Sequence, residues 1–369
     1  MSFQSGLRNH TPFAAFKLVL PDPTGQEATL VLVKATFEDN GTGELRLAQE
    51  QTPVHLADVP LDPDRAGRSS PLYEADIALE KPLVDVLLVG SAYAPEGRAA
   101  QEVPVALSVG DITKQLLVSG DRSWSGSLLG RRASRPVAFT RMPLVYERAF
   151  GGAADEKRPM FDVRNPVGVG FGGARSADSA VASELPNVEY PDALMRSPTD
   201  RPAPAGFGPL GRGWQPRSRY AGTFDAAWLS RQWPLLPHDF DPLHNQCAPA
   251  DQQSAGIRGG EWVKLINLTP EGVWQFRLPR LEVPVSLGYD REFVTTAPRL
   301  DTVLIESDTR RVVLTSRLSL RTQRKRGLLR EILLGHPTPG YLRARAAGKR
   351  FIDRWTIESA ARPGLYFEL

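Results

Sequence analysis

The sequence contains a single cysteine, Cys247, among 369 residues. One cysteine cannot form an intramolecular disulfide or a cysteine zinc cluster, and its scarcity fits a reducing compartment. No run approaches the roughly 20 apolar residues of a membrane span, and residues 1–10 lack the apolar core of a secretory signal. We therefore expect a soluble, cytoplasmic protein that does not act at a membrane.

Enzyme signatures are also scarce. No serine or cysteine has the neighbouring residues that are typical of the nucleophile of a hydrolase or protease. The glycine-rich run at 164–173 lacks the lysine of a phosphate-binding loop. One cluster offers metal-ligand chemistry, and it consists of His238, Asp239, Asp241 and His244. This cluster leaves a metal-dependent hydrolase as an alternative, although Asp also stabilises turns through the backbone. We expect no bound metal or other cofactor.

Charge is modest overall but unevenly distributed. The net charge of +3 is too small to indicate nucleic acid as a partner. Residues 310–354 hold 13 Lys or Arg and 2 Asp or Glu, so the C-terminal region is basic. Within it, Arg321, Arg324, Lys325 and Arg326 lack the interleaved aromatic residues of a nucleic-acid surface. This cluster suits an acidic protein partner or an ordinary solvated surface, and both interpretations remain open.

Strand patterns dominate both ends of the chain. Residues 1–150 contain β-branched and apolar runs separated by turn signals, at a spacing typical of a sandwich or barrel. Residues 151–260 lose this pattern to Gly and Pro, residues 261–326 return to hairpins, and residues 327–369 form a basic tail with weak helical segments. The predicted fold class is mainly β, an antiparallel sandwich-like scaffold with a long ordered insertion. Whether the first and last strands share a sheet is open.

Several local expectations follow from periodicity. Thr223 is predicted to cap a short helix at 224–232, and residues 328–334 and 341–355 are expected to be helical. In the strand at 311–320, Val313, Thr315, Arg317 and Ser319 alternate with an apolar set, so their face is expected to be exposed to solvent.

The most informative stretch, residues 206–252, mixes Gly and Pro with Trp, Phe and charged residues. Aromatic bulk argues against disorder, and long ordered loops are usually functional. Most of the tryptophans there should be core, with one or two exposed as binding anchors. Candidate partner-binding residues are Arg164, Asn165, Phe207, Trp214, Arg217, Tyr220, Trp228 and Trp233. Candidate loop-organising residues are Asp225, Asp239, Asp241, Asn245 and Asp251.

Short motifs in a fixed order carry a resemblance over roughly residues 10–320. They include RNPVGVGF at 164–171, LPNVE at 185–189, PAGFGPL at 204–210, WQPR at 214–217, YAGTFD at 220–225, DFD at 239–241 and LTPEG at 268–272. Together they resemble a bacterial family catalogued as domain of unknown function 2169, a group of type VI secretion adaptors. The sequence departs from the family pattern at 247–250, where Ala or a second Pro is expected in place of Cys247 or Ala250.

The resemblance implies a non-enzymatic adaptor or chaperone in the cytoplasm. Such a protein binds a cognate toxin effector, often one with a PAAR domain, and helps to load it onto the VgrG spike. The expected partners are therefore a secreted effector and the VgrG spike or PAAR tip, with neither nucleic acid nor membrane. A phage-like baseplate component, which would stay assembled in the apparatus, is a weaker alternative.

Overall fold

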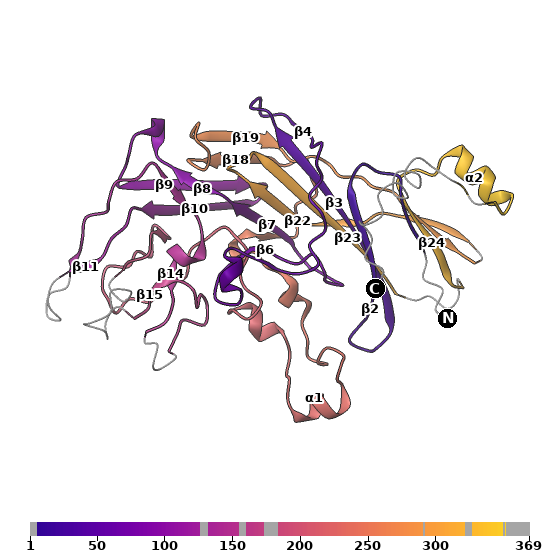
Figure 1. Ribbon diagram of the computed structural model, residues 1–369, viewed down its shortest axis with the longest axis horizontal. Helices are drawn as coiled ribbons and strands as arrows, with labels where there is room; N and C mark the ends of the chain where they lie inside the picture. The colour runs from indigo at the N-terminus through magenta and orange to yellow at the C-terminus, as the bar shows by residue number, and fades with distance from the viewer. Residues whose placement is uncertain are drawn as a thin grey trace.

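The computed structural model describes residues 6–125, 132–154, 160–172, 184–290, 292–321, 327–349 and 351. The chain is mainly β and sandwich-like, as the sequence predicts. Figure 1 shows two larger sheets together, a smaller sheet with helix α2 (Pro339–Ala346) at one end, and helix α1 (Ala226–Arg231) at the tip of a projection.

A seven-stranded sheet forms the centre of the molecule. Its strands are β2 (Ala14–Pro21), β3 (Glu27–Asp39), β4 (Leu45–Leu47), β7 (Val84–Val89), β17 (Gln253–Ser254), β22 (Arg299–Glu306) and β23 (Arg311–Arg321). The order is β17-β7-β22-β23-β3-β2, with β4 on β3, and β7 and β22 run parallel. Because β23 pairs with β3 along its whole length, strands from both ends of the chain share this sheet.

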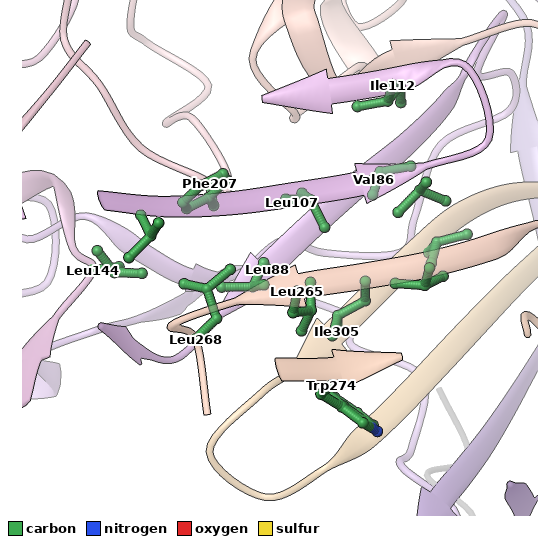
Figure 2. Close-up of a cluster of buried hydrophobic side chains, with 14 of the residues drawn as sticks. Val86, Leu88, Leu107, Ile112, Leu144, Phe207, Leu265, Leu268, Trp274 and Ile305 are labelled. Carbon is green, nitrogen blue, oxygen red and sulfur yellow. The ribbon is translucent and has the colours of Figure 1, made fainter. Parts of the chain in front are cut away.

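A five-stranded sheet packs against it. Its order is β16 (Val188–Glu189), β10 (Ile112–Ser119), β9 (Glu102–Val109), β18 (Trp262–Ile266) and β19 (Val273–Arg277). Inward side chains of both sheets form the largest apolar core, in which Leu107 and Leu265 lie with Val86 and Ile305 (Figure 2). Alternate residues of β9, β18 and β19 are buried and exposed, which is the pattern of a sheet covered on one face.

The smaller sheet contains a segment that the sequence pattern predicted to be helical. Its order is β1 (Gly6–Asn9), β24 (Leu329–Leu334), β20 (Val285–Tyr289) and β21 (Phe293–Thr296). Residues 329–334 were expected to be helical, and that prediction is wrong. They form a strand because β1 and β20 flank them and Ile332, Leu333 and Leu334 are all buried.

The two predicted helices exist in shortened form. Helix α1 begins after Asp225, whose carboxylate accepts from the Trp228 N–H at 2.7 Å, so Asp225 rather than Thr223 is the N-cap. Helix α2 begins after Thr338, which accepts from the Tyr341 N–H. Of the helix predicted at 341–355, residues 350 and 352–355 lie outside the described residues.

Short strand pairs connect the sheets to the irregular regions. They are β5 (Val59–Pro60) with β6 (Pro71–Tyr73), β8 (Ser91–Tyr93) with β13 (Arg141–Pro143), β11 (Trp124–Ser125) with β12 (Arg132–Ala133), and β14 (Phe150–Gly151) with β15 (Val169–Gly170). Residues 48–80, which we name the strap, contain β5 and β6 and cross the second face of the seven-stranded sheet.

The prediction that this second face is exposed to solvent is wrong for three residues of β23 and holds for Ser319, which is exposed. Val313, Thr315 and Arg317 of β23 are all buried. Val313 packs against Cys247 and Ala248, while Arg317 donates to Asp301 and to strap carbonyls. The irregular stretch and the strap therefore cover this part of the face, so the middle of the seven-stranded sheet is buried on both sides.

Candidate partner-binding surface

Arg217 joins three segments at the centre of the irregular stretch. Its guanidinium forms a two-point pair with Glu74 of the strap, with N–O distances of 3.1 and 2.8 Å. It also donates to the backbone carbonyls of Leu210 and His244. The side chain is buried, so a partner would not reach it in this conformation. Its contacts instead fix the loops to one another.

Lys114 fixes two of the same loops from inside the five-stranded sheet. It occupies an inward position of β10, and its ammonium donates to the Gly206 carbonyl at 2.7 Å, Asp251 Oδ1 at 2.9 Å and Gln252 Oε1 at 2.8 Å. Burial lowers the pKa of Lys114 to about 8, against the opposing effect of Asp251. A buried ammonium with three acceptors positions the loops at 206 and 251.

Three more candidate residues are interior. Asn165 is buried and donates to the carbonyls of Tyr146 and Phe150. Phe207 is buried in the main core (Figure 2), and its carbonyl accepts from Leu88 and Gln252. The Trp214 ring is buried edge-on against the Tyr146 ring. These side chains organise the structure rather than face a partner.

The remaining candidates lie nearer the surface. Arg164 is half-buried and pairs with Asp162 through two donors. Tyr220 is half-buried beneath the exposed Arg219, whose guanidinium lies 4.7 Å from the centre of its ring. Trp228 and Trp233 lie in the projection that carries α1, so the structure brings these two, and not the full set of eight, to one exposed region.

Residues 221–241, which we name the lobe, form that projection (Figure 1). Asp239 closes its base by accepting from the Thr223 N–H at 2.9 Å and its hydroxyl at 2.7 Å. These two bonds lower the pKa of Asp239. Asp241 caps the following turn at Leu243, and Gln232 donates to the Pro23 carbonyl at the β2–β3 turn. The lobe is thus a closed loop that is hydrogen-bonded to the β2–β3 turn.

The lobe presents large apolar side chains to solvent. Phe224 is 55% exposed, Leu229 63%, Trp233 64% and Leu236 39%. The ring of Phe224 packs edge-on against Trp228, with centroids 4.8 Å apart, while the Trp228 indole N–H donates to the Leu235 carbonyl. Exposed apolar groups that are concentrated on an ordered projection are typical of a protein-binding surface.

The two other loop-organising candidates also make loop contacts. Asn245 donates to the Glu80 carbonyl at the end of the strap. Asp251, besides Lys114, accepts from the Tyr190 hydroxyl at 3.0 Å. Both bonds connect segments distant in sequence, so these side chains define how the irregular stretch lies on the scaffold.

The histidine and aspartate cluster does not assemble into a metal centre. Asp239 and Asp241 are engaged in the backbone contacts described above, and His244 Nδ1 lies 3.1 Å from the Arg217 carbonyl oxygen. Among the residues that the structure describes, no group of three or more His, Cys, Asp or Glu is placed to hold a metal ion. The geometry therefore gives the hydrolase alternative no support.

A second surface feature is an apolar groove of about 180 Å³ beside the strap. Its lining includes Leu72 of the strap, Leu88 of β7, Leu144, Pro209 and the charged Arg141. This volume is below the several hundred Å³ of a typical cofactor or substrate pocket. It suits a single large side chain.

Several organising residues were missed in the sequence. Glu74, Gln252 and Asp85 lie in irregular or apolar stretches, and their roles depend on distant contacts. Asp85, for example, accepts from the Gln246 side chain and the Cys247 N–H, both at 2.8 Å. Lys114 did leave a signal, since it breaks the apolar set formed by Ile112, Leu116 and Val118 on the inward face of one strand. Of the basic cluster near the C-terminus, Arg321 is exposed, and residues 324–326 lie outside the described residues.

The fold and these contacts define a mainly β protein in which an irregular, tightly bonded stretch covers one sheet and projects an aromatic lobe. Within the described ranges, no helix is long and apolar enough to cross a membrane. The chain belongs to the DUF2169 family, described as uncharacterized proteins conserved in bacteria, whose profile matches residues 24–317. No curated protein and no solved structure matched the chain.

Proposed function

We propose that the protein is a non-enzymatic, cytoplasmic adaptor of a type VI secretion system. It binds a cognate toxin effector, often one that contains a PAAR domain, and promotes loading of that effector onto the VgrG spike. The observation that carries the proposal is the lobe, with four exposed apolar side chains on a loop that hydrogen bonds close at its base. Family membership and the resemblance of the sequence motifs to such adaptors add support.

The lobe is suited to holding a protein partner for physical reasons. Protein interfaces depend on a few large apolar anchors, and Trp is among the commonest. Anchors on a rigid element lose less entropy on binding than anchors on a mobile loop. The Asp239 and Asp225 contacts provide that rigidity at the base of the lobe and at the start of α1.

A variant series tests the lobe as the effector contact. Trp233→Ala and Leu229→Ser are each expected to weaken effector binding by about 2 kcal/mol, roughly 30-fold in Kd. Both residues are exposed, so the free energy of unfolding should change by no more than about 0.5 kcal/mol. Binding is measured by calorimetry with the effector encoded beside the gene, after co-purification of the wild-type complex.

Trp262→Ala is the matched control. Trp262 is 52% exposed on β18 and lies under the Arg277 guanidinium, outside the lobe. This substitution should leave the Kd unchanged. If it weakens binding as much as Trp233→Ala does, or if both lobe variants bind normally, the lobe is not the contact.

The adaptor role itself is tested in cells. Deleting the gene should abolish effector secretion while VgrG is still secreted, and the effector should then accumulate in insoluble or degraded form. Normal secretion of a soluble effector in the deletion strain would contradict the proposal, whatever the lobe does in vitro.

A further inference from the structure

A small cavity lies between the strap and the seven-stranded sheet. The cavity has a volume of about 30 Å³, enough for water but not for a ligand. Lys34, Lys81 and Arg317 of the scaffold contribute to its wall, and His55 and Tyr73 contribute from the strap. Glu74 and Asp76 of the strap line the same cavity, so His55 lies beside both buried cations and carboxylates.

His55 occupies a position that suits only the neutral imidazole. Its ring packs on Tyr73, with centroids 5.2 Å apart, and its Nδ1 lies 3.3 Å from Lys34 Nζ. Because an ammonium can only donate, Nδ1 accepts this bond and carries no proton. A proton on Nδ1 would remove the bond and place two positive charges at that distance.

The same residue joins the two arms of the strap. The His55 N–H donates to Asp76 Oδ2 at 2.7 Å, and the Asp76 N–H donates to the His55 carbonyl at 2.8 Å. Lys34 Nζ donates to the same Asp76 oxygen at 2.8 Å. Moving Lys34 and His55 apart would therefore disturb the bonds that fasten the strap to β3.

The other charges near His55 are already paired. Glu306 of β22 accepts from the Tyr73 hydroxyl at 2.6 Å, and Arg317 of β23 pairs with Asp301 at 2.6 Å. Glu74 of the strap pairs with Arg217 and Arg212. Of the carboxylates near His55, Asp76 bonds to His55 through the backbone N–H, and the same oxygen accepts from Lys34.

Burial, followed by Lys34, lowers the pKa of His55, although Asp76, Glu306 and a backbone hydrogen bond at Glu74 oppose the shift. A strap that has opened to solvent would return the pKa to its ordinary value of about 6.5. The open form therefore binds a proton more readily than the closed form. The contribution of the neutral His55 to the stability of the closed strap is therefore fully present above the ordinary pKa. It decreases as the pH falls below that value.

We propose that the strap is a pH-responsive cover. When His55 takes a proton, residues 48–80 loosen from β3 and β23 and uncover the second face of the seven-stranded sheet, which includes the buried Lys81 and Cys247. Acidification thus changes the surface of the scaffold while the sheets stay folded. This device does not depend on the partner of the lobe.

Hydrogen exchange on the full chain tests the proposal. Between about pH 7.5 and about pH 5.5, the range over which an unperturbed imidazole changes charge, protection factors of the strap should fall by as much as about tenfold, the most that one group with an open-form pKa of about 6.5 contributes over this range. Peptides from β9 and β18 should keep their protection. Equal protection of the strap at the two pH values, after correction for intrinsic exchange, overturns the proposal.

His55→Gln separates this effect from general acid sensitivity. A glutamine amide oxygen can accept from Lys34 and does not titrate, so the variant should lose the pH dependence. The control, His238→Gln, changes an exposed histidine of the lobe and should retain it. If His55→Gln does not fold, an NMR titration of the wild-type imidazoles decides: a His55 pKa at or above the ordinary imidazole value of about 6.5 rules the proposal out.

Discussion

Replacement of Arg217 by alanine is expected to lower the free energy of unfolding by about 3–5 kcal/mol, the cost of breaking a buried ion pair from one side. In the variant, Arg212 is the one remaining ion-pair partner of the Glu74 carboxylate among the described residues. The carbonyls of Leu210 and His244 also lose the donors that Arg217 provides. Urea denaturation measures the loss. Lysine at this position restores the charge but not the two-point geometry, so it should recover only part of the stability.

Arg219→Ala is the control for this prediction. Arg219 is two positions along the same turn, but it is exposed and contacts Tyr220 alone among its described partners. Exposed contacts of this kind contribute little, so its loss should be within about 1 kcal/mol. Similar effects of the two alanine variants would show that the buried pair with Glu74 does not hold the irregular stretch in place.

The sheets were predictable where pattern and burial are local. Strands β9 and β18 alternate inward and outward residues, and the turn beside Asn267 and Gly272 closes the hairpin that the sequence indicates. Strand β24 was missed because its short apolar run is equally compatible with a helix. Pairing with β1 and β20, which come from distant parts of the chain, decides the outcome.

The prediction that Thr315 and Arg317 of β23 face solvent was wrong for a related reason. Thr315 and Arg317 are polar, and polar residues alternating with apolar ones usually face water. Here Asp301 and the carbonyls of the strap satisfy Arg317 in the interior. Periodicity describes one strand and cannot show that a segment more than two hundred positions away covers it.

The candidate site was predictable in part. Composition identified residues 206–252 as ordered, and the five aspartates and asparagines singled out there all bond to the loop or scaffold. Composition could not tell which aromatic rings face outward. Trp214 and Trp233 occur in similar sequence contexts, yet one is buried against Tyr146 and the other is exposed on the lobe.

Lys114→Met is expected to lower the free energy of unfolding by about 3 kcal/mol, because it leaves buried acceptors without a donor at roughly 1–3 kcal/mol each. The Gly206 carbonyl and Gln252 Oε1 are both buried, so water does not replace the lost bonds. Part of the loss is offset, since methionine removes an ammonium whose pKa burial has lowered to about 8.

The control for Lys114 lies in the same sheet. Lys264 of β18 is exposed, and Lys264→Met should change stability by no more than about 0.5 kcal/mol. Hydrogen exchange adds a readout specific to position: protection in Lys114→Met should fall most around residues 204–210 and 250–254, which Lys114 holds to β10. Uniform loss across both sheets would show that Lys114 supports the core as a whole. Loss confined to those two segments would show that one buried ammonium orders the loops from which the lobe extends.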